Sequence, residues 1–163
     1  MSKVPIRAIA VFNGKKVKGT VVFTEDLENN QVIIDIDLHG LKNNFLHGFH
    51  VHEYGDMSDG CQSMCKHFNP YGKSHGPNDS HERHIGDLGN IRTNSFGIAK
   101  YQTTDSFIKL RGTKANIIGR GLIIHADTDD LGNGGNEESL KTGNAGKRIA
   151  CAVIGYSKEN FKC

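Results

Sequence analysis

The sequence predicts an all-β protein whose antiparallel strands pack as a sandwich or barrel. Short runs alternate apolar and polar residues with period two, twenty glycines and three prolines provide turn residues, and helical periodicity is sustained nowhere. At 163 residues the chain is the size of one domain and can bury a core without the help of disulfide bonds or structural metal ions. We therefore expect a single domain over residues 1–163.

The first expected element is a hairpin through "RAIAVFNGKKVKGTVVF", with Asn13-Gly14 at the turn. This dipeptide accepts the positive φ angles of a tight turn. In "VIIDIDLHG", positions 34, 36 and 38 are apolar and positions 35, 37 and 39 are polar, as in a strand that covers a core on one side. "GFHVHEYGD", "FGIAKYQTT", "FIKLRG" and "GRGLIIHAD" are read as further strands.

Two segments, residues 55–90 and 126–148, do not fit this strand-and-turn spacing. Both are rich in Gly, Asn, Asp and charge, and loops of this length are usually functional or disordered. Disorder is the plainer interpretation of the second segment. The first gathers histidines, which an ordinary solvated linker has no reason to do.

Histidines on the expected strands and in the first loop suggest a metal site. His50 and His52 lie two positions apart on a strand and therefore share a face, about 7 Å apart. His125 ends the apolar run "GLIIH" and offers a third nitrogen. The plainer alternative is a set of half-buried histidines satisfied by carbonyls. The loop adds a set that suits tetrahedral zinc, although spacing alone does not decide between His81 and His84: His67, His75, His81, His84 and Asp87.

Charge and hydropathy exclude two broad classes of function. Twenty Lys and Arg face 18 acidic residues, so the formal charge of +2 indicates neither nucleic acid nor membrane binding. The N-terminus alternates apolar and polar residues and lacks the continuous apolar run of a signal peptide. We expect no membrane span and a cytoplasmic location.

Five motifs, in order and spacing, closely resemble the copper/zinc superoxide dismutases: "GFHVHEYGD", "HFNPYGKSHG", "ERHIGDLGN", "GRGLIIHADTDDLGNGGNEESLKTGNAGKRIAC" and "VIG". The resemblance runs from the first hairpin to about Gly155. It implies an eight-stranded Greek-key β-barrel, an architecture grouped with the immunoglobulin-like sandwiches. It also implies one such domain over the whole chain, with a short extra tail from about residue 157.

The resemblance implies one copper and one zinc per subunit, with His67 shared between them. Copper would be held by His50, His52, His67 and His125, and zinc by His67, His75, His84 and Asp87. Asp129 would accept hydrogen bonds from one ligand of each metal and so orient both rings. His47 would tie loops together without binding metal, and His81 is left as an exposed loop residue.

The reaction implied is the dismutation of superoxide. Cu(II) would take an electron from one superoxide to release dioxygen, and Cu(I) would return it to a second, which leaves as hydrogen peroxide with two protons. Zinc is not a redox metal and would shape the site, while His67 would carry a proton. Arg148 would lie beside the copper, and a further set would guide the anion to it: Lys141, Thr142, Glu137 and Glu138.

The resemblance also implies a disulfide between Cys61 and Cys151, which would join the first long loop to the last strand. A homodimer is implied, with Gly55, Ile118, Gly119 and Ile154 in its interface segments, and loading by a copper chaperone is carried over by analogy. Tyr156 and the tail that ends in Cys163 depart from the family pattern.

Two departures bear on activity. Asp127 adds negative charge near the copper, where many relatives have lysine, and Cys65 stands where small residues or proline are usual. They leave open an alternative in which the same fold sequesters copper without fast turnover. A third interpretation is a zinc-binding interaction module built from Cys61, Cys65, His67 and His75, which leaves the other histidines without a role.

Overall fold

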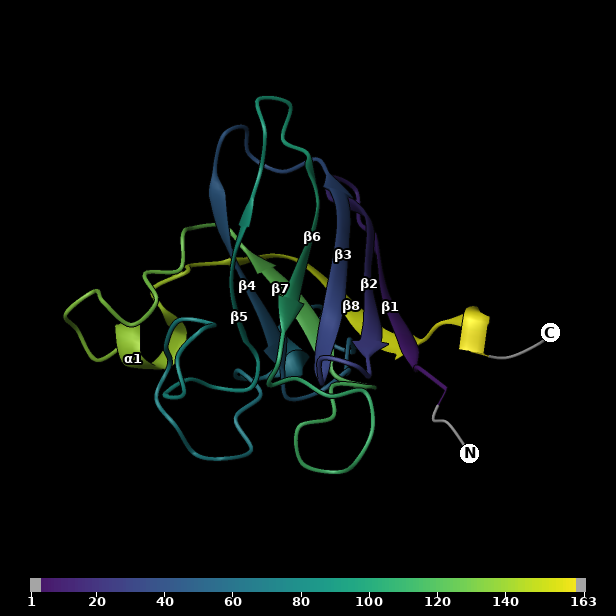
Figure 1. The fold of residues 1–163 in the computed structure, drawn as a ribbon. Helices are drawn as coiled ribbons and strands as arrows, with labels where there is room; N and C mark the ends of the chain where they lie inside the picture. Colours follow the sequence, from purple (N-terminus) through teal and green to yellow (C-terminus); the bar gives the residue numbers. More distant parts are fainter. Residues whose placement is uncertain (1–3, 161–163) are drawn as a thin grey trace.

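The computed structural model describes residues 4–160 and confirms the all-β prediction (Figure 1). Eight antiparallel strands form one nearly closed barrel in the order β5-β4-β7-β8-β1-β2-β3-β6. The strands are β1 (Arg7–Asn13), β2 (Lys18–Asp26), β3 (Gln31–His39), β4 (Leu46–His52), β5 (Asp87–Arg92), β6 (Ala99–Asp105), β7 (Gly121–His125) and β8 (Arg148–Tyr156). Short helical turns are η1 (Gln62–Met64), α1 (Ser139–Thr142) and η2 (Lys158–Asn160).

The predicted first hairpin is present, but its turn differs from the prediction. Asn13 pairs with Lys18 as the last residue of β1, so the loop spans residues 14–17 and is closed by the Gly14 amide, which donates to the Val17 carbonyl at 3.1 Å. Neither Asn13 nor Gly14 has a positive φ. The turn instead packs on Gly40, where an added Cβ would lie 1.9 Å from the Lys16 carbonyl oxygen.

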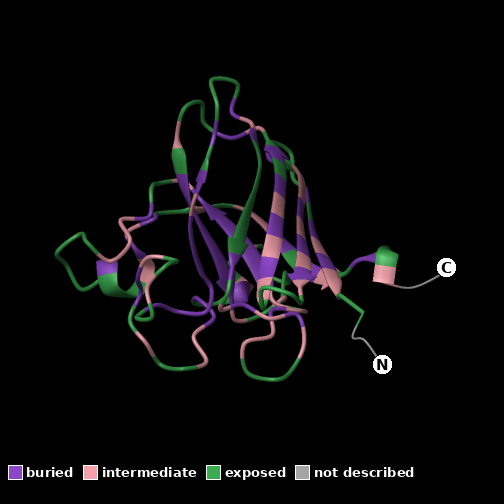
Figure 2. Ribbon diagram, in the orientation of Figure 1, coloured by how far each residue is buried: buried purple, intermediate pink, exposed green. Residues whose placement is uncertain are grey.

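The period-two pattern of β3 is confirmed by burial. Ile34, Ile36 and Leu38 are buried in the core, whereas Asp37 and His39 are exposed. Figure 2 shows the resulting bands of buried and partly exposed residues along neighbouring strands of this side of the barrel. The core therefore lies where the sequence pattern places it.

The expected strand "FIKLRG" is not a strand. Residues 107–112 form an irregular connection with a single bridge from Lys109 to Asn116. Ile108 and Leu110 are nevertheless fully buried. Alternating apolar residues here belong to a loop whose side chains pack into the core, which period two alone does not distinguish from a strand.

Crossing connections bring the histidine-bearing segments together. β4 pairs with both β5 and β7, and β7 pairs with β8, so the chain crosses the barrel between β3 and β4 and again between β6 and β7 in a Greek-key arrangement. The two long loops follow β4 and β7, which are neighbours. Figure 1 shows both loops on the same side of the barrel.

Buried polar contacts hold the first long loop against the barrel. The Arg83 guanidinium is buried, donates to Asp105 Oδ2 on β6 at 2.6 Å, and also donates to the carbonyls of His84 and Ile85. Because a buried guanidinium needs such partners, this contact fixes the loop next to two of the predicted ligands, His84 and Asp87.

Among residues 4–160, no helix has the length and apolar character needed to cross a membrane.

Candidate metal centre

Strand geometry delivers the first group of histidines. His50 and His52 project from β4, His125 ends the neighbouring β7, and His67 reaches the group through an isolated bridge with His52. All four side chains are buried, and one ligand nitrogen from each lies within 4.8 Å of the others. Four neighbouring imidazoles in a dry pocket make a site for a transition metal.

The hydrogen bonds of these rings leave one nitrogen of each unpaired. His52 Nδ1 donates to the Cys65 carbonyl at 2.8 Å, and His125 Nδ1 donates to the Gly146 carbonyl at 3.0 Å. In these four rings, the buried nitrogens without a hydrogen-bond partner are His50 Nδ1, His52 Nε2, His67 Nε2 and His125 Nε2. A buried nitrogen without a partner is costly, so this set fits metal ligands rather than packing residues.

The protonation of the rings in the first group suits the same role. Burial holds the pKa values of His50 and His52 well below the usual histidine range and lowers the pKa of His125 to about 4. The rings are therefore neutral near pH 7, and each unpaired nitrogen offers a lone pair.

A second group surrounds the carboxylate of Asp87, the first residue of β5. Asp87 Oδ1 lies 2.9 Å from His67 Nδ1, 2.9 Å from His75 Nδ1 and 3.2 Å from His84 Nδ1. Three nitrogens and a carboxylate oxygen suit zinc. The ligand atoms that lie within 4.8 Å of one another here belong to His50, His67, His75 and Asp87, whereas His84 approaches the group through Asp87 and through His67 Nδ1, 3.2 Å from its own Nδ1. Because His50 Nε2 is engaged by Asp129 and its Nδ1 belongs to the first group, the predicted ligand His84 is available for the fourth position.

Opposite charge stabilises the second group. Burial alone would raise the pKa of Asp87, but hydrogen bonds from His67, His75 and His84 hold that pKa well below its usual range. Burial alone would lower the pKa of His75, but the hydrogen bonds to Asp129 and Asp87 outweigh this effect and raise the pKa to about 9. Without metal His75 thus keeps a proton, which a metal ion must displace.

Asp129 joins the two groups. Its Oδ2 accepts a hydrogen bond from His50 Nε2 at 2.6 Å, and its Oδ1 accepts one from His75 Nε2 at 2.8 Å. The main chain of Asp129 is held in turn by the side-chain amide of Asn90. One buried carboxylate therefore orients a histidine in each group, as the resemblance implies for Asp129.

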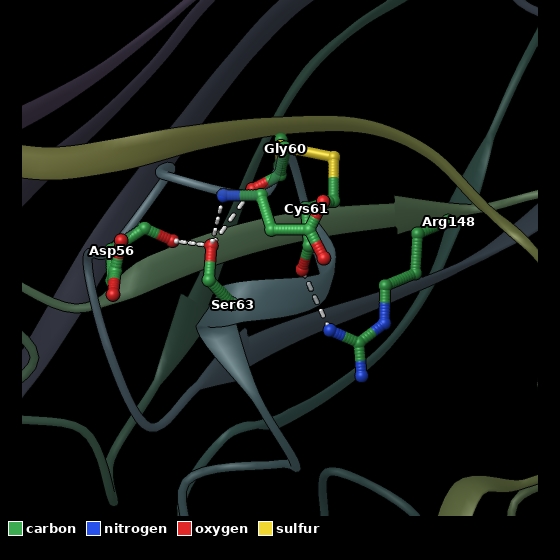
Figure 3. The surroundings of a disulfide bond; sticks show 7 residues. Asp56, Gly60, Cys61, Ser63 and Arg148 are labelled. Atoms are coloured by element: carbon green, nitrogen blue, oxygen red, sulfur yellow. Dashed lines mark hydrogen bonds between the residues drawn. A yellow bond between two sulfur atoms is a disulfide. The ribbon is translucent and has the colours of Figure 1, made fainter.

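The disulfide between Cys61 and Cys151 is present, with a Cα separation of 5.7 Å, and joins the first loop to β8. Arg148 lies beside it, and its Nη1 donates to the Cys61 carbonyl at 2.7 Å (Figure 3). Its Nη2 donates to the Cys65 carbonyl at 2.5 Å. Because Cys61 is bridged, it offers no thiolate to zinc, and the zinc-module interpretation is wrong. Cys65 is a free, exposed thiol outside both ligand groups.

A cavity of about 950 Å³ opens next to the first group. Every predicted guiding residue lines it, together with His52, His67 and His125: Glu137, Glu138, Lys141, Thr142 and Arg148. Asp127 does not line the cavity; its carboxylate packs against Gly146, where an added Cβ would lie 2.1 Å from Asp127 Oδ2. The carboxylate of Asp127 is exposed to solvent but is not part of the cavity lining.

The remaining predicted residues lie outside both groups. His47 Nδ1 donates to the His125 carbonyl at 2.8 Å and its Nε2 accepts from the Lys42 amide, so it ties segments together as expected. His81 is exposed and packs on the edge of Phe107. Cys163 lies outside the described residues.

Sequence reasoning missed the carbonyls of Cys65 and Gly146, because a main-chain acceptor has no sequence signature.

Comparison with known proteins agrees with this geometry. The family model for copper/zinc superoxide dismutase matches residues 17–154. Superoxide dismutase [Cu-Zn] of Paramecium bursaria Chlorella virus 1 is 65% identical over 157 residues, covering 96% of this chain and 82% of that protein. The Neurospora crassa protein of the same name is 51% identical over 154 residues, covering 94% and 99%.

A solved structure gives the same result for the fold. The crystal structure of the clock protein EA4 superposes with a TM-score of 0.90 at 40% identity, covering 96% of this chain and 98% of that one. With the family model spanning most of the barrel and relatives above half identity, the chain belongs to the copper/zinc superoxide dismutase family, whose two metals match its two ligand groups.

Proposed function

We propose that this site dismutates superoxide, converting two superoxide anions and two protons into dioxygen and hydrogen peroxide. One observation carries the proposal. Four buried, neutral imidazoles each present an unpaired nitrogen to one point, and one of them, His67, also contacts the carboxylate group next to it. An unconnected pair of metal sites would not need such a shared ring.

The ligand sets follow from the two groups. His50, His52, His67 and His125 hold copper, and His67, His75, His84 and Asp87 hold zinc, with one ion of each per chain. Imidazole presents a nitrogen on each side of its ring, so His67 serves both ions once both ring protons are lost. The whole chain acts as one domain, and residues 157–160 lie outside the site.

Copper, when bound, supplies the one-electron exchange with superoxide, and zinc supplies fixed charge. The protein relays protons from the solvent and supplies the geometry. His67 accepts a proton at Nε2 and passes it to the departing peroxide, while its Nδ1 stays directed at Asp87. Asp129 keeps His50 and His75 in place during this exchange.

Arg148 and the second loop bring the anion to the site. The Arg148 guanidinium faces the cavity while its two carbonyl contacts fix its position. Lys141 is the cationic guide on α1, held 2.6 Å from Glu137, and Thr142 is held by Glu138. Superoxide offers few contacts, so speed depends on attraction into the cavity, and superoxide dismutase is a standard example of such steering.

A homodimer and a copper chaperone are finer proposals. An added Cβ on Gly55 would lie 2.2 Å from the Gly119 carbonyl oxygen and 3.0 Å from Val153, so the expected interface segments adjoin one another. Ile154 is buried in the core, whereas Val153 and Tyr54 are exposed and supply apolar surface. Chaperone loading and a cytoplasmic location rest on family analogy and on the sequence.

The decisive measurement is the decay of superoxide in the presence of protein whose copper and zinc contents have been determined. We expect fast decay that slows as salt rises, because steering by surface charge is screened. Copper bound at one ion per chain without catalysed decay would establish copper sequestration instead.

A further inference from the structure

The wall of the cavity carries more positive charge than the predicted guides explain. Its cationic side chains are Lys66, Lys73, Lys141 and Arg148, and its carboxylates are Glu137 and Glu138. Lys66 and Lys73 belong to the first long loop, whereas the predicted guiding residues belong to the second. Lys66 directly precedes His67 in the chain.

Three of these cations are engaged by close partners. The Arg148 guanidinium donates to the carbonyls of Cys61 and Cys65. The Lys73 ammonium donates to the His81 carbonyl at 2.5 Å. The Lys141 ammonium pairs with Glu137 at 2.6 Å, so a carboxylate offsets much of its field.

Lys66 differs from these three cations because its main chain is fixed while its side chain is only loosely paired. Its carbonyl accepts a hydrogen bond from the Glu53 amide at 2.9 Å, which anchors the residue next to His67. Its ammonium lies 4.0 Å from Glu53 Oε1, the outer limit of an ion pair, and its side chain is 77% exposed. Of the cavity cations that the structure describes, Lys66 therefore has the loosest pairing.

We infer that Lys66 is a further substrate-steering residue, which attracts the superoxide anion into the cavity from the side of the first loop. The inference rests on the proposed function, since the anion is its substrate. A loosely paired ammonium at the rim projects its field into the approach over roughly a Debye length, about 10 Å at 0.1 M salt. Lys66 does not touch the reacting atoms and binds no metal.

The test compares Lys66→Gln and Lys66→Glu with Lys15→Gln and Lys15→Glu. Lys15 is exposed in the β1–β2 turn and does not line the cavity, so each control makes the same change in net charge. The second-order rate constant for superoxide decay is measured at matched copper and zinc content, from about 10 mM to about 1 M salt.

At the lowest salt we expect the rate constant to fall about twofold for Lys66→Gln and about fourfold for Lys66→Glu, with both converging on the wild type at the highest salt. The Lys15 variants should stay close to the wild type throughout. Azide, a small monovalent anion titrated against the visible copper(II) spectrum, should bind more weakly to the Lys66 variants in the same order.

Lys66 variants that match the Lys15 variants in both rate and azide affinity would overturn the inference. A wild-type protein that binds copper and zinc but does not accelerate decay would overturn the proposed function instead, and azide affinity would still report whether Lys66 sets the field of the cavity.

Discussion

At this centre, the hydrogen-bond partner of each histidine ring decides which ring nitrogen remains free for a metal. His52 and His125 each donate one ring hydrogen to a main-chain carbonyl, which fixes the tautomer and leaves Nε2 free for a metal. His50 is oriented the other way round, with Nε2 on Asp129 and Nδ1 free. The same residue type thus uses different nitrogens because its partners differ.

Asp129→Asn should weaken metal binding at both groups. An amide keeps one acceptor oxygen but replaces the other with a donor, so it cannot accept hydrogen bonds from both His50 and His75. We expect copper or zinc affinity to fall about 10- to 100-fold, measured by competition with chelators of known affinity. Asp127→Asn, a change at an exposed carboxylate outside the cavity, is the matched control. Equal affinities in the two variants would contradict this role for Asp129.

Cys65 adopts a backbone conformation that favours glycine, with φ 60° and ψ −140°. Such conformations cost of order 1–3 kcal/mol for other residues, of which glycine loses part to chain entropy. Cys65→Gly should therefore raise the free energy of unfolding by about 1 kcal/mol, seen as a melting temperature a few degrees higher. Cys65→Ser removes only the thiol and should not change stability. A lower melting temperature for the glycine variant would refute the strain.

The sequence predicted the ligands on strands better than those in loops. His50 and His52 lie two positions apart in the strand "GFHVH", so the period of a strand places them on one face. The choice between His81 and His84 needed the family resemblance, because loop spacing does not encode direction. In the structure, Arg83 is buried between them and fixes which side of the chain faces the centre.

At the scale of elements, the second loop is shaped by α1 and the glycine that ends it. Gly143 has φ 67° as the C-cap of α1, and an added Cβ would lie 2.0 Å from Asp129 Oδ1 and 2.5 Å from His75 Nε2. Because of this close approach, the end of α1 packs directly against the carboxylate that links the two groups.

Gly143→Ala should disturb both the fold and the centre. The methyl group must displace Asp129 or His75, and the left-handed φ adds strain, so we expect a loss of more than about 2 kcal/mol in stability together with weaker zinc binding. Gly135→Ala is the matched control, because Gly135 has φ 73° with no atom within 4 Å of an added Cβ. Calorimetry and zinc titration of both variants measure the difference. Equal losses would show that backbone strain alone matters.

Elements were predictable where burial follows period two and unpredictable where it does not. β3 came from such a pattern, whereas β7 is buried along its whole length and was indicated by its continuous apolar run. Residues 107–112 show the same alternation but form a loop whose apolar side chains join the core, and Asn13 ends β1 while the turn that follows packs on Gly40. Both errors arise from tertiary contacts that a local pattern does not contain.

At the scale of the whole molecule, the disulfide spans 90 residues between the first long loop and the last strand. The double variant Cys61→Ser, Cys151→Ser should lower the free energy of unfolding by about 4 to 5 kcal/mol in the chain-entropy model. Denaturant unfolding of the metal-free proteins measures this loss, with Cys65→Ser as a variant that keeps the bridge. A difference below about 1 kcal/mol would show that the reduced chain is already constrained.

The whole-molecule arrangement was the part least accessible from residues alone. Periodicity indicated a sandwich or barrel, but the neighbours of each strand, and hence the meeting of β4 with β7, depend on crossing connections. Only the family resemblance supplied that topology in advance.

The single carboxylate of Asp129 also makes the two metal equilibria one thermodynamic system. Asp129 holds His50 on one side and His75 on the other, and His67 belongs to both groups, so ordering either set of rings lowers the entropy cost of ordering the other. Such coupling is reciprocal: the factor by which zinc raises copper affinity equals the factor by which copper raises zinc affinity. We therefore expect a chain deprived of one metal to retain the other less tightly.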